Sequence, residues 1–239
     1  MVERLKLALK NPALPLVLRA GLLAVAVFWL RAGPISGFKA PIFLLVFFIF
    51  YLKPNINAGK FWVSTLMLLV IALFAPRVGG LLGLYINAVL GLLIFMLLGV
   101  KNLIFLRRQG IYYWLHLILI VGVTGLYFIG NLSPILLFVL LAVLFREFYL
   151  VMTNQNSELV NLVATTESML LTQAAWISSL FPASFLISSS FLMLIAFVMH
   201  DLLLNDFKNA LSKTIVLRDA IMLAAFCLLA LVTPLWGIE

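Results

Sequence analysis

The stretch 81–100, LLGLYINAVLGLLIFMLLGV, is twenty residues long and contains no charged side chain. A helix of about 20 apolar residues is long enough to cross the hydrocarbon core of a bilayer. The whole chain of 239 residues has the same character, with 65% hydrophobic residues, 10% charged residues and a mean hydropathy of +1.23. Soluble domains contain about a quarter charged residues. The sequence therefore predicts an all-α, polytopic transmembrane helix bundle.

Eight further apolar runs accompany this one, and glycine and proline residues separate them in short turns. The nine runs cover residues 14–30, 38–52, 61–75, 81–106, 111–129, 135–152, 159–180, 183–199 and 220–236. The second and third runs are short for a span, so a re-entrant pair is the alternative there and the count is eight to nine. The longest segment between runs, 200–219, is too short to fold alone. We therefore expect one integral membrane domain over 1–239, with no soluble domain.

The distribution of positive charge predicts the orientation of the chain. Three of the sixteen Lys and Arg residues (Arg31, Lys39 and Arg77) fall in the segments opposite the N-terminus, and Arg19 lies within the first run. The other twelve fall on the side of the N-terminus, in the pattern of cytoplasmic segments: Arg4, Lys6, Lys10, Lys53, Lys60, Lys101, Arg107, Arg108, Arg146, Lys208, Lys213 and Arg218. We expect a cytoplasmic N-terminus, an outside C-terminus and a prokaryotic plasma membrane.

The net charge of +8 does not indicate nucleic-acid binding, because the cations are scattered between apolar runs and form no continuous patch. The expected partners are the lipid bilayer and, in a larger assembly, other membrane protein subunits. The single cysteine, Cys227, excludes a multi-cysteine metal site. No metal and no cofactor is expected.

The segment FVMHDLLLND, 197–206, ends the eighth run. Apolar residues recur at helical spacing after it, at Leu204, Phe207, Leu211 and Ile215. This pattern predicts a cytoplasmic, interfacial amphipathic helix over 201–219, with Asp201 or Asn205 as its N-cap. The alternative is a catalytic or proton-carrying pair of His200 and Asp201.

Ionisable residues inside the apolar runs are costly and usually face a partner. Arg146 and Glu147 lie about two turns from the cytoplasmic end of the sixth run, and Glu167 lies at a similar depth in the seventh. A buried ion pair between Arg146 and Glu167 is the structural interpretation. A proton or substrate relay is one alternative, and a position of Arg146 and Glu147 among the head groups is another.

Two runs carry patterns that indicate close helix contacts. The seventh has a polar seam and the fourth a stripe of small residues, both at spacings that keep them on one helix face. The seam predicts either close helix packing or the wall of a solvated pathway. The stripe predicts a tight helix crossing. The seam contains Asn161, Thr165, Ser168 and Thr172, and the stripe contains Gly79, Gly83, Asn87 and Gly91.

Two functional hypotheses follow from these features. The first, which we prefer, is a non-enzymatic transport-type or scaffold subunit of a membrane assembly. The second is a small intramembrane enzyme that acts at the cytoplasmic leaflet through Glu147, Glu167 and His200, with His116 at the same depth as a further chemical group. Outside that hypothesis, we expect His116 to be a satisfied helix residue. No Gly-x-Ser-x-Gly or His-Glu-x-x-His motif supports the enzyme.

Overall fold

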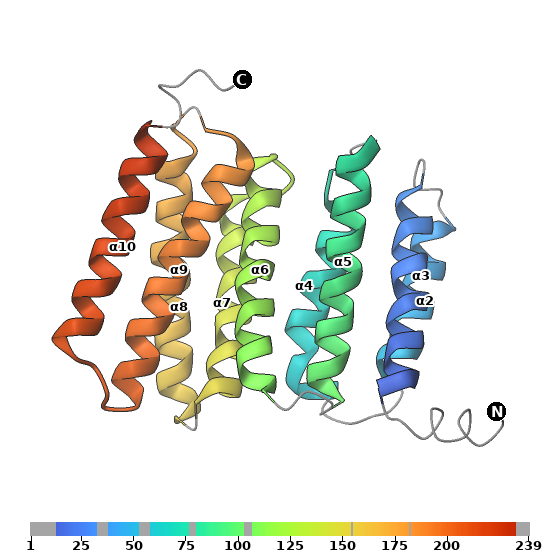
Figure 1. The fold of residues 1–239 in the computed structure, drawn as a ribbon, viewed down its shortest axis with the longest axis horizontal. Helices are drawn as coiled ribbons and strands as arrows, with labels where there is room; N and C mark the ends of the chain where they lie inside the picture. Colours follow the sequence, from blue (N-terminus) through green and yellow to red (C-terminus); the bar gives the residue numbers. More distant parts are fainter. Residues whose placement is uncertain are drawn as a thin grey trace, which may run out of the picture. The chain divides into compact units, whose positions relative to one another are not determined.

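The structure is a computed structural model that describes residues 13–32, 38–52, 58–76, 80–102, 107–153, 155–181 and 183–232. The described part of the chain is helical and contains no strand (Figure 1). Each of the nine predicted runs overlaps a helix. The helices are α2 (Ala13–Arg31), α3 (Lys39–Leu52), α4 (Trp62–Phe74) after a 3-10 turn η1 (Ala58–Phe61), α5 (Gly80–Lys101), α6 (Arg108–Phe128), α7 (Pro134–Met152), α8 (Ser157–Ser178), α9 (Phe185–Phe207) and α10 (Lys213–Val232).

Among the described residues, four helices are long and apolar enough to cross a membrane: α5 over Gly83–Lys101, α6, α7 and α9. The outer faces of these helices carry exposed apolar side chains, such as Leu84 and Leu92 on α5, which are 56% and 53% exposed. Apolar faces of this kind are suited to lipid rather than to water. The second and third predicted runs form shorter helices, and α8 is made less apolar by its acidic, amide and hydroxyl residues. The structure thus supports a membrane location with four candidate spans.

The chain divides into two compact units, residues 1–115 and 116–239. In the first unit, α2 contacts α3, α4 and α5. Two buried cations satisfy backbone carbonyl groups at helix ends. Arg31 donates to the carbonyl oxygens of Ala75 at 3.2 Å and Pro76 at 2.6 Å, at the end of α4, and Lys101 donates to the carbonyl of Tyr51 near the end of α3. These carbonyl groups have no partner within their own helix, so a cation stabilises them there.

The small-residue stripe of α5 lies in this first unit. Gly91 faces Ala24 of α2 so closely that an added Cβ would lie 2.9 Å from the Ala24 Cβ atom. Gly83 is buried and Asn87 is half-buried, while Gly79 lies outside the described residues. Only a residue without a side chain allows α2 and α5 this approach at position 91.

In the second unit, α7 contacts α8, α8 contacts α9, and α9 contacts α10. Successive helices run in opposite directions, as the ribbon shows (Figure 1). Polar side chains begin three of these helices: the Ser133, Asn156 and Ser184 oxygens accept from backbone N–H groups in the first turns of α7, α8 and α9. These caps replace hydrogen bonds that a helix cannot supply at its own start.

The sequence predicted one interfacial helix over 201–219, but this segment does not form a single helix. Its first seven residues complete α9, and α10 begins at Lys213. Asp201 and Asn205 do not cap a new helix, because the Asn205 side chain donates to the Asp201 carbonyl at 2.8 Å within α9. The chain turns at Asn209, whose φ of 51° is a left-handed conformation that asparagine tolerates better than most residues.

Candidate functional site

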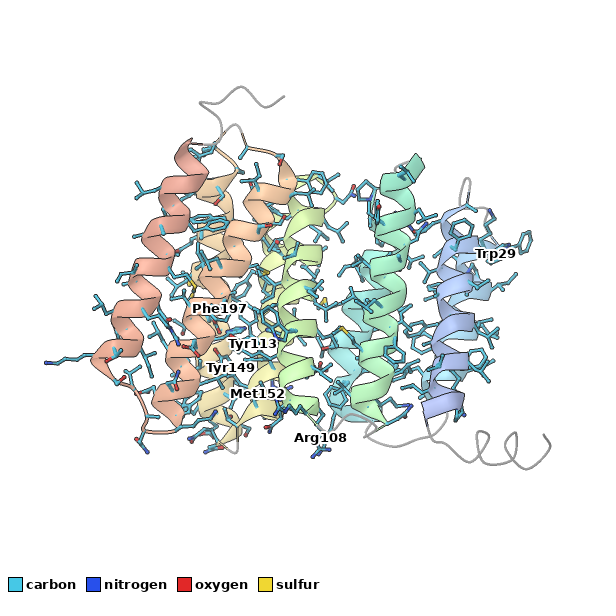
Figure 2. The ribbon with its side chains drawn as sticks, viewed as in Figure 1. Trp29, Arg108, Tyr113, Tyr149, Met152 and Phe197 are labelled. Carbon is cyan, nitrogen blue, oxygen red and sulfur yellow. The ribbon has the colours of Figure 1, made fainter. Side chains whose placement is uncertain are left out.

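Four buried polar side chains meet in the second unit, one from each of four helices. We call them the buried network: His116 of α6, Tyr149 of α7, Glu167 of α8 and His200 of α9. None is more than 2% exposed. Tyr149 is labelled on α7 in Figure 2 together with Phe197, which lies one turn before His200 on α9. Four helices therefore converge on a site that no single segment of the sequence contains.

The hydrogen-bond geometry links all four side chains. The Tyr149 hydroxyl donates to Glu167 Oε2 at 2.7 Å and lies 3.1 Å from His200 Nδ1. Glu167 Oε1 lies 2.6 Å from the same Nδ1 atom. Oε1 has no hydrogen-bond partner among the described residues, so this approach is a close contact that becomes an ion pair when His200 has a proton on both nitrogens. On the other side of the ring, His200 Nε2 lies 2.9 Å from His116 Nε2.

Aromatic rings surround the two histidines. The Phe148 ring is nearly parallel to both, with centroids 4.2 Å from His116 and 4.4 Å from His200. Phe145 meets His200 edge-on at 5.0 Å. Both phenylalanines are fully buried. The rings keep water from the imidazole pair, and a low local dielectric strengthens the electrostatic interactions within the network.

The helix directions bring the histidines to one height. His116 lies eight residues after the start of α6, and His200 lies seven residues before the end of α9. Because α6 and α9 run in opposite directions (Figure 1), the two residues have similar distances from the same end of the unit. Phe145, Phe148 and Tyr149 follow at helical spacing on the buried face of α7.

The chemistry of the histidine pair follows from its contact through Nε2 atoms. A hydrogen bond between two imidazole nitrogens contains one proton, so one ring donates and the other accepts. If His200 has a proton on both nitrogens, it is a cation beside Glu167 and donates to His116. If His200 has a proton on Nδ1 alone, His116 donates instead. The network therefore accommodates one additional proton without losing the hydrogen bond between the rings.

Arg146 and Glu167 do not form the expected buried ion pair. Arg146 lies on the exposed face of α7, where its Nε donates to Asn161 Oδ1 at 2.6 Å. Glu167 instead faces Tyr149 and His200. Positions 146 and 149 lie only about 60° apart around the α7 axis, and this small rotation leaves Arg146 exposed and Tyr149 buried. The other α7 candidate, Glu147, is buried with 7% exposure.

Asp201 does not pair with His200. Its carboxylate meets the Arg218 guanidinium of α10, which also contacts Asp219 at 2.7 Å. This cluster joins α9 to α10. Consecutive helix residues diverge by about 100°, so His200 faces the network while Asp201 faces α10.

Three members of the polar seam bond within α8, whereas the fourth, Asn161, bonds to Arg146 of α7. The hydroxyls of Thr165, Ser168 and Thr172 donate to backbone carbonyls three or four residues earlier at 2.7, 2.8 and 2.8 Å. Thr165 and Asn161 are exposed, whereas Ser168 is buried. Hydroxyl groups satisfied in this way need no partner on another helix.

Sequence reasoning missed Tyr149, and it gave His116 a role only in the enzyme hypothesis. The sequence did contain one signal for the site, the predicted depth of these residues in the membrane. Both histidines of the chain and Glu167 lie near the predicted cytoplasmic ends of their apolar runs. Tyr149 carried no such signal, since a tyrosine near a helix end is usually an interfacial anchor. Its role depends on which way α7 is rotated.

In the part of the chain that the structure describes, no group of three or more His, Cys, Asp and Glu side chains has the arrangement of a metal site. Comparisons of the chain with protein-family models, with curated proteins and with solved structures found no match. The chemistry of the buried network is therefore the basis for the function.

Proposed function

We propose that this chain is a transport-type membrane subunit whose buried network takes up and releases a proton. The observation that carries the proposal is the 2.9 Å contact between the Nε2 atoms of His116 and His200, with Glu167 2.6 Å from Nδ1 of His200. A proton that enters this group converts a site with one negative charge into a neutral one. Linked ionisable groups within a membrane are typical of proton relays in pumps and transporters.

A purely structural scaffold is less well supported by these contacts. Replacing a buried ionic group by apolar residues of similar volume often leaves stability unchanged or raises it. Four polar side chains that meet in one buried group therefore favour a chemical role. The polar side chains are enclosed by Phe145 and Phe148, so proton exchange requires a second conformation in which these rings move.

We also propose a membrane topology for the chain. Four apolar helices support a membrane location. We propose in addition a multi-pass domain of up to nine spans in a prokaryotic plasma membrane, with the N-terminus in the cytoplasm and the C-terminus outside, because the Lys and Arg residues are distributed in that way. Other membrane subunits are the proposed protein partners.

Proton flux into liposomes tests the function. The full chain is reconstituted, a potassium diffusion potential is imposed with valinomycin, and internal acidification is followed with a pH-sensitive dye. We expect flux through the wild-type protein, and its loss in Glu167→Gln and His200→Phe. Glu158→Gln is the matched control, because it removes an exposed carboxylate from the same helix and should leave the flux unchanged.

The two histidines allow a direct measurement of protonation, because ¹⁵N labelling of histidine gives four ring-nitrogen signals in total. We expect the signals of both rings to change at each step as pH is varied, since linked groups gain and lose protons as a pair. Independent changes of the two rings, or wild-type flux equal to that of protein-free liposomes, would show that the proposal is wrong.

An intramembrane enzyme is the second candidate, and one contact favours it. A carboxylate beside a histidine Nδ1 atom is the arrangement that orients a general base, and Glu167 and His200 have it. A lipid or peptide substrate consumed by wild-type protein and not by His200→Phe, in the absence of proton flux, would support this candidate instead.

A further inference from the structure

A cavity of about 370 Å³ lies at the other end of the second unit, where α6 and α8 end and α7 and α9 begin. Ser178, which lines it, is eleven residues after Glu167 on α8, or about 16 Å along the helix axis. Small-molecule sites in proteins have volumes of about 300 to 1,000 Å³. The cavity is thus separate from the buried network and large enough for a ligand.

Two serine hydroxyl groups that line this cavity have no hydrogen-bond partner among the described residues. Ser178 and Ser188 are 6% and 5% exposed, and both line the cavity. Their side chains make no hydrogen bond, ion pair or other polar contact in the described part of the chain. The neighbouring Ser189 differs, because its hydroxyl donates to the Phe185 carbonyl at 2.6 Å. Neither hydroxyl oxygen is among the fully enclosed side-chain atoms that have no partner, so both oxygens are accessible and can bond to a ligand in the cavity that they line.

The other lining residues define the chemistry of that partner. The described residues of the lining include Tyr127, Phe128, Phe181 and Phe185 but no Asp, Glu, Lys, Arg or His. A charged ligand would lose its hydration without gaining a counter-ion there. Aromatic side chains are enriched where a membrane meets water. The cavity suits an uncharged, amphipathic molecule whose polar end both donates and accepts hydrogen bonds.

We propose that this cavity binds an uncharged, hydroxyl-bearing group of the glycerol type, held by the hydroxyls of Ser178 and Ser188. The group is either the head of a neutral glycerolipid or a free polyol. A serine hydroxyl donates one hydrogen bond and accepts others, which matches an alcohol at both positions. The proposal does not depend on the proton network, since it uses a different part of the same unit.

The test uses the full chain in phosphatidylcholine nanodiscs, with dioctanoylglycerol and glycerol as probes and native mass spectrometry of retained ligand as the readout. We expect dioctanoylglycerol to bind and the double variant Ser178→Ala, Ser188→Ala to lose about tenfold in affinity, the effect of removing two ordinary hydrogen bonds. Ser189→Ala is the matched control and should bind as the wild type does. Thermal unfolding checks that each variant is folded.

The probes distinguish the two sources. Serine-dependent binding of dioctanoylglycerol assigns the site to a lipid head, and serine-dependent binding of glycerol alone assigns it to a free polyol; either result supports the proposal. Stronger serine-dependent binding of phosphatidic acid would overturn it in favour of an anion site. Absence of binding by both probes, or binding that the double variant retains in full, would overturn it as well.

Discussion

Replacing Tyr149 by Phe removes one oxygen atom from the centre of the buried network. The substitution retains the ring contacts of Tyr149 with Phe148 at 5.3 Å and Phe207 at 5.9 Å. What it removes is the hydroxyl that donates to Glu167 Oε2 at 2.7 Å and lies 3.1 Å from His200 Nδ1. The effect of Tyr149→Phe on stability therefore measures the hydrogen bond rather than the packing.

The expected magnitude follows from the charge and burial of the acceptor. A hydrogen bond to a charged group contributes about 1.5 to 3 kcal/mol, and a buried acceptor left without its donor gains no water in exchange. Glu167 is 2% exposed. We expect Tyr149→Phe to lower the free energy of unfolding by about 1.5 to 3 kcal/mol. The loss should be smaller when Glu167 is already Gln, because the two side chains act on each other.

The assay is reversible unfolding in mixed detergent micelles, for the two single variants and the double variant. Tyr85→Phe is the control, since Tyr85 is 64% exposed on α5 and its loss should change stability by no more than about 0.5 kcal/mol. Equal stability of Tyr149→Phe and wild-type protein, or strictly additive losses in the double variant, would refute the network as described.

Two further predictions concern helix contacts. Gly91→Ala should lower the free energy of unfolding by about 1 to 3 kcal/mol, because its methyl group would lie 2.9 Å from a side-chain carbon of α2. Gly21→Ala is the control and should be neutral or stabilising, since its methyl group would meet nothing within 4 Å. Equal thermal unfolding of the two variants would contradict this account. Asp219→Asn should lower the unfolding temperature more than Asp201→Asn, since the Asp219 side chain is 1% exposed and that of Asp201 is 27% exposed beside the same exposed Arg218. The opposite order would show that the exposed contact between Asp201 and Arg218 contributes more stability than the buried Asp219.

The helices of this protein could be predicted from its sequence. Continuous apolar runs in a membrane have few alternatives to helix, because every backbone polar group must be paired within the segment. All nine runs accordingly overlap helices. The end of α9 was placed wrongly, because the charged residues after His200 resemble an interfacial segment, whereas Asn205 bonds within the helix and Asn209 provides the turn.

For the candidate site, the position of a residue along its helix gives its depth, and depth is a property of the sequence. On that basis Glu167 and His200 were expected at one level, as found. The partners of each residue depend on rotation about the helix axis, and α7 and α9 are apolar on nearly all sides, so their sequences contain little that specifies which face is turned inward. The packing of four helices against one another therefore decides that Glu167 bonds to Tyr149 and not to Arg146. The same packing decides that His116 contacts His200.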